Sequence, residues 1–290
     1  MLSNSIGRRF GFTSCQGATN SFGSNRSSRL LSRSSKGRED DTDDWRKFRA
    51  KLVFSEEEQS MNDLPGPQMS EPNLARFLSE DSEFAESEPL WAHAVPGPEQ
   101  GGLLIATSMV DAGTSHSLPE HLWQTVIFLL ECSPNGSVGL VLNRPTILSL
   151  QKTMLRDEMG ESRLRASFAE NRLYCGGEHK QEIISILHRY DTCGGQLICP
   201  GVYLGGHAGA VSAVESMGHD PFTFKFFSGC EMWMKGELEK EIEDGLWHCA
   251  AASSSLILKN CLNLPVPLYV ETLKLMGGKY AAEAARVYEE

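Results

Sequence analysis

The chain has 290 residues, of which 40% are hydrophobic, and it carries 38 acidic against 27 basic side chains. This acidic excess argues against non-specific binding to nucleic acids, which requires lysine and arginine to neutralise phosphates. No run of 18 apolar residues occurs, so we expect no membrane-spanning helix.

The first 38 residues differ in composition from the rest of the chain. They are rich in serine and contain seven basic residues and no acidic one, whereas the other 252 residues carry 20 basic and 38 acidic side chains, a net charge of −18. Such a segment is typical of an organelle transit peptide. We therefore predict a transit peptide at 1–38 and the chloroplast stroma as the destination. The mitochondrion is the alternative destination, and a disordered tail is the competing interpretation.

Two segments separate this N-terminus from the main domain. Trp45, Phe48 and Leu52 recur at steps of three and four residues, which predicts a short amphipathic helix at 39–55. Residues 56–88 contain ten acids and one base, and so polar a segment buries too little surface to offset its ordering entropy. We predict an acidic linker there and one folded domain at 89–290.

The main domain alternates short apolar runs with turn residues, a pattern that predicts strands. The predicted strands are 102–108, 123–131, 137–143, 171–177, 183–188, 202–206, 222–229 and 246–252. Helices are predicted at 149–159, 208–217, 235–244, 267–276 and 281–288. Because strands and helices do not alternate regularly, an α+β fold is favoured over a doubly wound α/β fold.

The stretch "GSVGLVLNRPT" (136–146) ends an apolar strand in an amide, a guanidinium and a proline. Asn143 can hydrogen-bond an adjoining turn, and Arg144 can reach a carboxylate or carbonyl groups with its planar fork. One interpretation is a structural latch. The other is an anion or ligand site shared with two Gly-Gly turns, which let backbone or ligand approach closely. These turns are Gly176-Gly177 and Gly205-Gly206.

The eight cysteines are scattered without C-x-x-C spacing, so free buried thiols are expected rather than a disulfide framework. Two alternatives remain open. Cys175 is a candidate nucleophile, with an oxyanion site at Gly176-Gly177 and His179 or His207 as base. Cys193 and Cys199 are a candidate redox pair. A structural zinc would need ligands from elsewhere in the fold, and we predict neither metal nor cofactor.

Other catalytic motifs are weak or absent. "LMGGKY" (275–280) lacks the first glycine and the Ser/Thr of a phosphate-binding loop and predicts a helix C-terminus instead. The five carboxylates of "GELEKEIEDG" (236–245) alternate around a helix whose other face is apolar, which indicates a solvated surface.

The order of these motifs resembles the YqgE/AlgH family, also called DUF179 or UPF0301. The resemblance rests on Asn143-Arg144-Pro145, on "LYCGG", and on the pattern that places Trp233 four residues after Gly229. "DWRKFRAKL", "WAHAVPGPEQGGLLIAT" and "LMGGKY" are similar to its plant and algal members, which carry a plastid-type extension. The resemblance implies an α+β fold with a bifurcated, mostly antiparallel sheet curled into a pseudo-barrel with flanking helices, and no established enzyme activity.

The chain departs from the family pattern at two places. The usual Gly-Gly-Pro is Gly176-Gly177-Glu178 here, and the usual Gly-Tyr-Ala-Gly-Trp is Gly-Cys-Glu-Met-Trp at 229–233. Any groove that these motifs line therefore differs in polarity. The transcriptional role proposed for bacterial relatives is not carried over, because the chain shows no helix-turn-helix motif or basic recognition surface.

Together these observations predict a non-catalytic binding or regulatory protein whose partner is a small molecule or another protein. A cysteine-dependent hydrolase or transferase and a redox-responsive interaction protein are the alternatives. The candidate binding residues are Asn143, Arg144, Gly176, Gly177, Gly205, Gly206 and Trp233.

Overall fold

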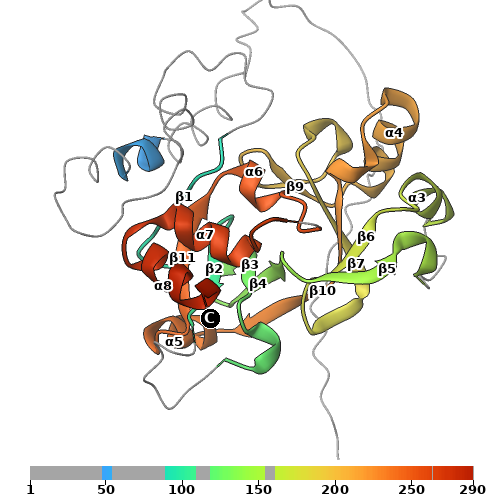
Figure 1. Ribbon diagram of the computed structural model, residues 1–290. Coiled ribbons are helices and arrows are strands. Elements are labelled where there is room, and N and C mark those ends of the chain that lie inside the picture. The colour runs from blue at the N-terminus through green and yellow to red at the C-terminus, as the bar shows by residue number, and fades with distance from the viewer. Residues whose placement is uncertain (1–47, 54–88, 109–117, 154–160, 263, 290) are drawn as a thin grey trace, which may run out of the picture. The chain divides into compact units, whose positions relative to one another are not determined.

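A computed structural model describes residues 48–53, 89–108, 118–153, 161–262 and 264–289. Its centre is a sheet of 11 strands in the order β1-β11-β2-β3-β4-β10-β7-β9-β8, and β5 and β6 branch from this path at β10 (Figure 1). The strands are β1 (Ala92–Ala94), β2 (Leu103–Ala106), β3 (Val126–Ser133), β4 (Gly136–Val141), β5 (Pro145–Ser149), β6 (Arg172–Cys175), β7 (His179–His188), β8 (Gln196–Cys199), β9 (Val202–Leu204), β10 (Lys225–Met234) and β11 (Trp247–Ala252).

Helices pack against this sheet and connect its strands. The α-helices are α3 (Glu161–Ser167), α4 (His207–Met217), α5 (Glu237–Glu243), α6 (Ser254–Ile257), α7 (Leu268–Met276) and α8 (Gly278–Glu289), preceded by a helical segment at 48–53. Short 3-10 turns are η2 (Glu120–Leu122), η3 (Leu150–Lys152), η4 (Asp191–Cys193) and η5 (Pro221–Thr223). No helix in these described ranges is both long and apolar enough to cross a bilayer.

Strand β10 divides the sheet into two parts. Its first half pairs antiparallel with β7 and parallel with β6, whereas its second half pairs antiparallel with β4. The register shifts between Ser228 and Cys230, around Gly229, whose φ of +76° favours glycine. The prediction of an α+β domain with a bifurcated, mostly antiparallel sheet and flanking helices is confirmed, although the sheet is not closed into a barrel.

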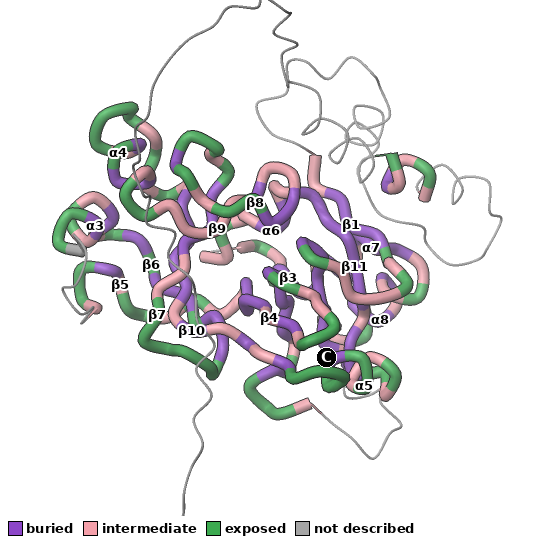
Figure 2. The backbone as a smooth tube through the Cα atoms, turned by 180° about the vertical axis from the view of Figure 1, so that it is seen from behind, coloured by how far each residue is buried: buried purple, intermediate pink, exposed green. Residues whose placement is uncertain are grey.

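Each part of the sheet has its own apolar core. In the larger one, Phe128 of β3 and Tyr269 of α7 are buried where α6, α7 and α8 cover the strands (Figures 1 and 2). In the smaller one, the rings of Phe168, Phe224 and Phe226 meet between α3, α4 and the branch of the sheet, with centroids 4.9 to 5.2 Å from Phe168. Strand β10 lies at the boundary between the two cores, so its side chains contribute to both parts of the domain.

The structure contains all eight predicted strands and three more, β1, β5 and β8. The predicted helix at 149–159 is wrong at its start, where β5 and η3 occupy the chain, and residues 154–159 lie outside the described ranges. The helical segment at 48–53 falls within the predicted helix at 39–55, of which the other residues are not described. The predicted transit peptide and acidic linker also lie outside the described residues. The helix C-terminus predicted in "LMGGKY" is found at Gly277, which ends α7.

Candidate functional site

Asn143 and Arg144 fasten the end of β4 to the loop between η2 and β3. The Asn143 amide accepts a hydrogen bond from Val126 N at 3.1 Å and donates to Gln124 O at 2.8 Å. One guanidinium nitrogen of Arg144 donates to Trp123 O. Both side chains therefore bind backbone groups of one loop, as the latch interpretation requires. Burial lowers the pKa of Arg144, which the charge of Cys175 opposes.

The Gly176-Gly177 turn lies directly against β10. Gly176 N donates to Ser228 O at 2.8 Å, and a Cβ at this position would overlap Gly229 O. Gly177 has a φ of +152°, and a Cβ there would overlap the backbone of Cys230. Only glycine allows so close an approach, so these residues are needed to seat the chain before β7 against the middle of β10.

This close approach positions a buried carboxylate. Glu231 follows the register shift in β10, and its side chain is only 8% exposed. Its Oε1 accepts a hydrogen bond from Glu178 N at 3.1 Å and lies 3.9 Å from His121 Nε2. Its Oε2 lies 3.8 Å from His179 Nδ1. A buried carboxylate needs such partners because removing its charge from water is costly.

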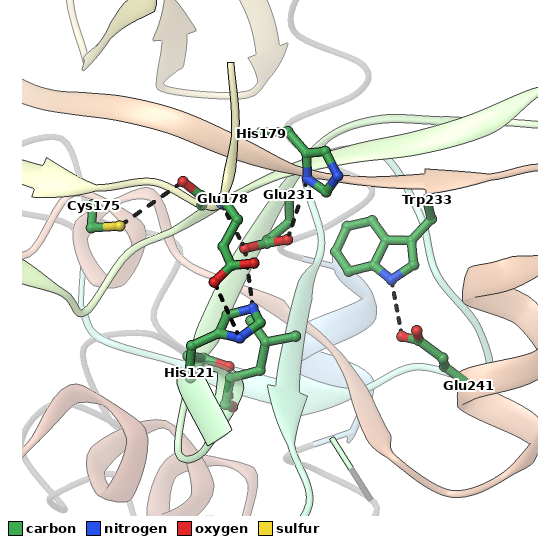
Figure 3. A network of polar contacts seen from close by, with 10 residues as sticks. His121, Cys175, Glu178, His179, Glu231, Trp233 and Glu241 are labelled. Atoms are coloured by element: carbon green, nitrogen blue, oxygen red, sulfur yellow. Dashed lines mark hydrogen bonds and ion pairs between the residues drawn. The ribbon is translucent and has the colours of Figure 1, made fainter. Parts of the chain in front are cut away.

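The groups around Glu231 reach the surface. The side chains of His121, Glu178 and His179 are 38%, 60% and 53% exposed, and His121 Nδ1 lies 3.4 Å from Glu178 Oε1. Figure 3 shows these three side chains around Glu231. We call His121, Glu178, His179 and Glu231 the acid–imidazole cluster. It joins η2, the turn after β6, the start of β7 and the middle of β10 into one surface.

Burial raises the pKa of Glu231, and this is the largest influence on it. The hydrogen bond from Glu178 N and the charges of His121 and His179 act in the opposite direction, whereas the Glu178 carboxylate adds to the rise. A carboxyl group with a raised pKa can exchange a proton closer to neutral pH than an exposed one. Nearby charges therefore influence the protonation of Glu231, the buried member of the cluster.

Three other predicted site residues are not part of this cluster. Gly205 N donates to Ile186 O at 2.8 Å, and Gly206, with a φ of +70°, precedes α4 and abuts Cys193 O. Trp233 is buried, and its Nε1 donates to Glu241 Oε2 at 2.9 Å, so its polar group binds α5 (Figure 3). The structure therefore brings Asn143, Arg144, Gly176 and Gly177 together but not Gly205, Gly206 or Trp233.

Comparison with known proteins shows the family of this chain. The family model described as AlgH-like, DUF179, matches residues 114–281. The chain belongs to this family. A UPF0301 protein of Chlamydia muridarum is 33% identical over 189 residues, covering 63% of this chain and 90% of its own. A UPF0301 protein of Chlorobium luteolum is 29% identical over 184 residues, covering 62% and 87%.

Two solved structures are also similar to this AlgH-like chain. The solution structure of the AlgH protein from Pseudomonas aeruginosa is 23% identical, with a TM-score of 0.44 over 67% of this chain and 92% of that one. The crystal structure of a Corynebacterium diphtheriae protein is 16% identical, with a TM-score of 0.46 over 65% and 92%.

Sequence reasoning missed the central residues of the cluster in this AlgH-like protein. Glu178 and Glu231 were noted only as departures from the family pattern, at separate places in the chain. The structure joins them, because the N–H of residue 178 donates to the carboxylate of residue 231. Proline, which the family pattern has at the first position, has no N–H to donate. The two departures from the family pattern, at 178 and 231, were therefore the signal in the sequence that could have indicated this contact. Nothing in the local sequence pattern indicates that His121 belongs to the cluster.

The arrangement does not assemble the predicted cysteine nucleophile. Cys175 is exposed, and its sulfur lies 3.9 Å from Gly177 O. The proposed bases are engaged elsewhere, since His179 faces Glu231 and His207 Nε2 lies 3.2 Å from Ile184 O. The proposed oxyanion donor Gly176 N is already bonded within the sheet, to Ser228 O.

The structure also does not assemble the predicted redox pair, and no metal site is found among the described residues. Cys193 and Cys199 are free and buried in different cores of the domain, Cys193 in the smaller one and Cys199 in the larger one. The seven cysteines that the structure describes are all free, but only Cys193, Cys199 and Cys249 are buried. Within the described ranges, no group of three or more His, Cys, Asp or Glu side chains is arranged to hold a metal ion.

Proposed function

We propose that this AlgH-like protein is a non-catalytic binding or regulatory protein whose ligand engages the acid–imidazole cluster. The buried Glu231 carboxylate supports this most strongly. It is held by one N–H and two imidazoles, and three exposed ionisable side chains surround it. A polar group so buried requires a fixed position, and its exposed neighbours offer both donors and acceptors to a polar ligand.

The partner class follows from charge and from the exposed groups. We propose a polar small molecule or a protein rather than a nucleic acid, since residues 39–290 carry a net charge of −18. The imidazoles of His121 and His179 and the carboxylate of Glu178 are the accessible contacts. Asn143 and Arg144 serve this site indirectly, because they bind the loop that directly follows η2, the element that carries His121.

A differential binding screen tests this function. We would melt the full-length protein with a library of polar metabolites and immobilise it for capture of partner proteins. Hits should be lost in His121→Gln and in Glu178→Gln, each of which removes an exposed contact without opening the core. Glu239→Gln, on the exposed surface of α5, is the matched control and should keep them. Hits that survive both cluster variants would place the binding function elsewhere.

Turnover is a separate outcome of the same screen. A metabolite that is converted by the wild-type protein and not by Cys175→Ser would replace the binding function with the cysteine-dependent alternative. We expect no such conversion, because the proposed bases face other groups.

We further propose that this is a plastid-type member of the family, targeted to the chloroplast stroma. The acid-free, serine- and arginine-rich residues 1–38 support this proposal. Fusion of residues 1–60 to a fluorescent reporter should direct the reporter to plastids. A mitochondrial signal would favour the alternative destination, and a cytosolic signal would exclude a transit peptide.

A further inference from the structure

Lys225, the first residue of β10, is a buried lysine in an apolar environment. Its Nζ lies over the ring of Tyr174, 4.8 Å from the centroid, and 5.6 Å from that of Phe227. Among the described residues its single hydrogen-bond acceptor is Lys259 O, at 3.0 Å. Lysine is rarely buried without a carboxylate partner, so its burial here suggests a chemical role of this amine.

A thiol shares the acceptor of this lysine. Cys261 Sγ lies 3.5 Å from the same Lys259 O, and also 3.5 Å from Leu142 O. Because Nζ lies 3.0 Å and Sγ 3.5 Å from one oxygen atom, the amine and the thiol are at most 6.5 Å (3.0 + 3.5) apart. Cys261 is partly exposed, in the loop between α6 and α7, whereas Lys225 is buried, so the cysteine is the more accessible of the two residues.

The charges of these two groups are coupled. Burial lowers the pKa of Lys225, which favours the neutral, nucleophilic amine. Burial also raises the pKa of Cys261, but the positive charges of Lys225 and Lys259 oppose that rise. The neutral amine of Lys225 is therefore placed to accept the thiol proton and to stabilise the thiolate that results.

We propose that Lys225 and Cys261 are the two ends of an oxidative cross-link formed in the presence of peroxide. In the first step the Cys261 thiolate attacks one oxygen of hydrogen peroxide, the O–O bond breaks, and sulfur becomes a sulfenic acid while the other oxygen leaves as water after taking the proton held by Lys225. In the second step the Nζ lone pair forms an S–N bond, and the sulfenic oxygen leaves as a second water. The sulfur is oxidised by two electrons and the peroxide is reduced.

The cross-link would tie the loop before α7 to the start of the dividing strand β10. This site differs from the Cys193–Cys199 pair, and it is independent of the acid–imidazole cluster. Exposed Cys175 provides an internal comparison, because a simple oxidation of accessible thiols would modify it first.

Peptide mapping of peroxide-treated, full-length protein tests the cross-link. We would oxidise with hydrogen peroxide, alkylate the remaining thiols, digest and analyse by mass spectrometry. The expected product joins the peptides that contain residues 225 and 261, with a mass about 2 Da below their sum, and dithiothreitol should reverse it. It should be absent from Cys261→Ser and retained in Cys175→Ser.

Lys225→Arg should abolish the cross-link and leave Cys261 as a sulfenic acid that dimedone labels. If that variant does not fold, mapping of the wild-type protein still decides the question. Three results would overturn the proposal: a Cys261 that stays reduced when Cys175 is oxidised, a Cys261 that is oxidised without joining Lys225, or a cross-link to Lys259 instead.

Discussion

At the scale of single residues, backbone contacts explain the motif that first suggested a site. Asn143 and Arg144 bind the carbonyl and N–H groups of one loop, which directly follows η2 and its His121. The sequence predicted that Asn143 would bond a turn and left two interpretations of Arg144 open. The structure favours the latch, because the guanidinium donates to the carbonyl oxygen of Trp123.

Replacing this guanidinium should lower stability. We expect Arg144→Lys to reduce the free energy of unfolding by about 1 kcal/mol, since an ammonium group cannot reproduce the planar fork that binds Trp123 O. Urea unfolding measures the loss, and Arg172→Lys, at an exposed position on β6, is the comparison. A melting temperature that is unchanged, together with a lost response to phosphate or sulfate, would show that Arg144 is an anion contact instead.

Glu231 should give the protein a characteristic pH dependence. Because burial raises its pKa, the folded state holds this proton to a higher pH than the unfolded chain does. Its contribution to stability is then fully present below the unfolded pKa and is lost as pH rises through the folded pKa. Relative to Glu231→Gln, the wild-type free energy of unfolding should fall as pH rises from about 4 towards neutrality.

Urea unfolding at a series of pH values measures this difference. The charged groups that face Glu231 are His121, His179 and Glu178. Glu239→Gln, on the exposed surface of α5, is the matched control because it leaves Glu231 and these three neighbours unchanged. A wild-type advantage that grows with pH would mean that the imidazoles outweigh burial.

At the scale of elements, one carboxylate docks a whole helix. Glu241 Oε2 accepts hydrogen bonds from Trp233 Nε1 at 2.9 Å and from Trp247 Nε1 at 2.7 Å. The two indoles pack edge to face, with centroids 6.3 Å apart, so α5 is attached to both β10 and β11. The sequence predicted a solvated row of acids here, and helical periodicity alone does not show that one of them turns inward.

Removing this acceptor should loosen α5. We expect Glu241→Ala to lower the free energy of unfolding by about 1–3 kcal/mol, because two buried N–H donors lose their partner. Glu239→Ala on the exposed face of the same helix should change stability little. Tryptophan fluorescence during urea unfolding follows both variants, and equal stability of the two would contradict the docking role.

At the scale of the whole molecule, the helical segment at 48–53 contacts the domain that follows it in the sequence. Arg49 NH2 lies 2.6 Å from Glu99 Oε1, and Ala50 is fully buried, so the helical segment at 48–53 packs on the main body. Between them lies the acidic segment at 56–88, which we predict to be a linker from its composition.

Trace protease should cut within 56–88 and leave the domain from about residue 90 intact. We expect the fragment that contains 48–53 to stay bound after this cut at low salt and to dissociate in Arg49→Ala. Gel filtration followed by mass spectrometry distinguishes the two. Protection of the whole stretch, or unfolding of the domain after cleavage, would show that 56–88 is part of the folded structure.

The local pattern of apolar and polar residues in the sequence predicted most strands of this fold, but it predicted little of the candidate site. Alternating apolar runs marked eight strands, but β5 was missed because Ile147 and Leu148 of this strand are exposed and follow a proline. The fold class came from the irregular order of elements. The acid–imidazole cluster was not predictable in this way, since His121 and Glu231 are 110 positions apart in sequence and meet only through the glycine turn at 176–177.

The position of β10 has a consequence for how the protein is made. Strands β4, β6 and β7 pair with β10, which comes later in the chain at residues 225–234. Strands β1 and β2 likewise pair with β11, which ends at Ala252. Pairings so distant in sequence form slowly, because long loops must close first. During synthesis, the apolar edge of β4 and the outer edge of β2 therefore remain unpaired until most of the chain has been made. Chaperones that shield nascent strands should matter more for this protein than for one built from local hairpins.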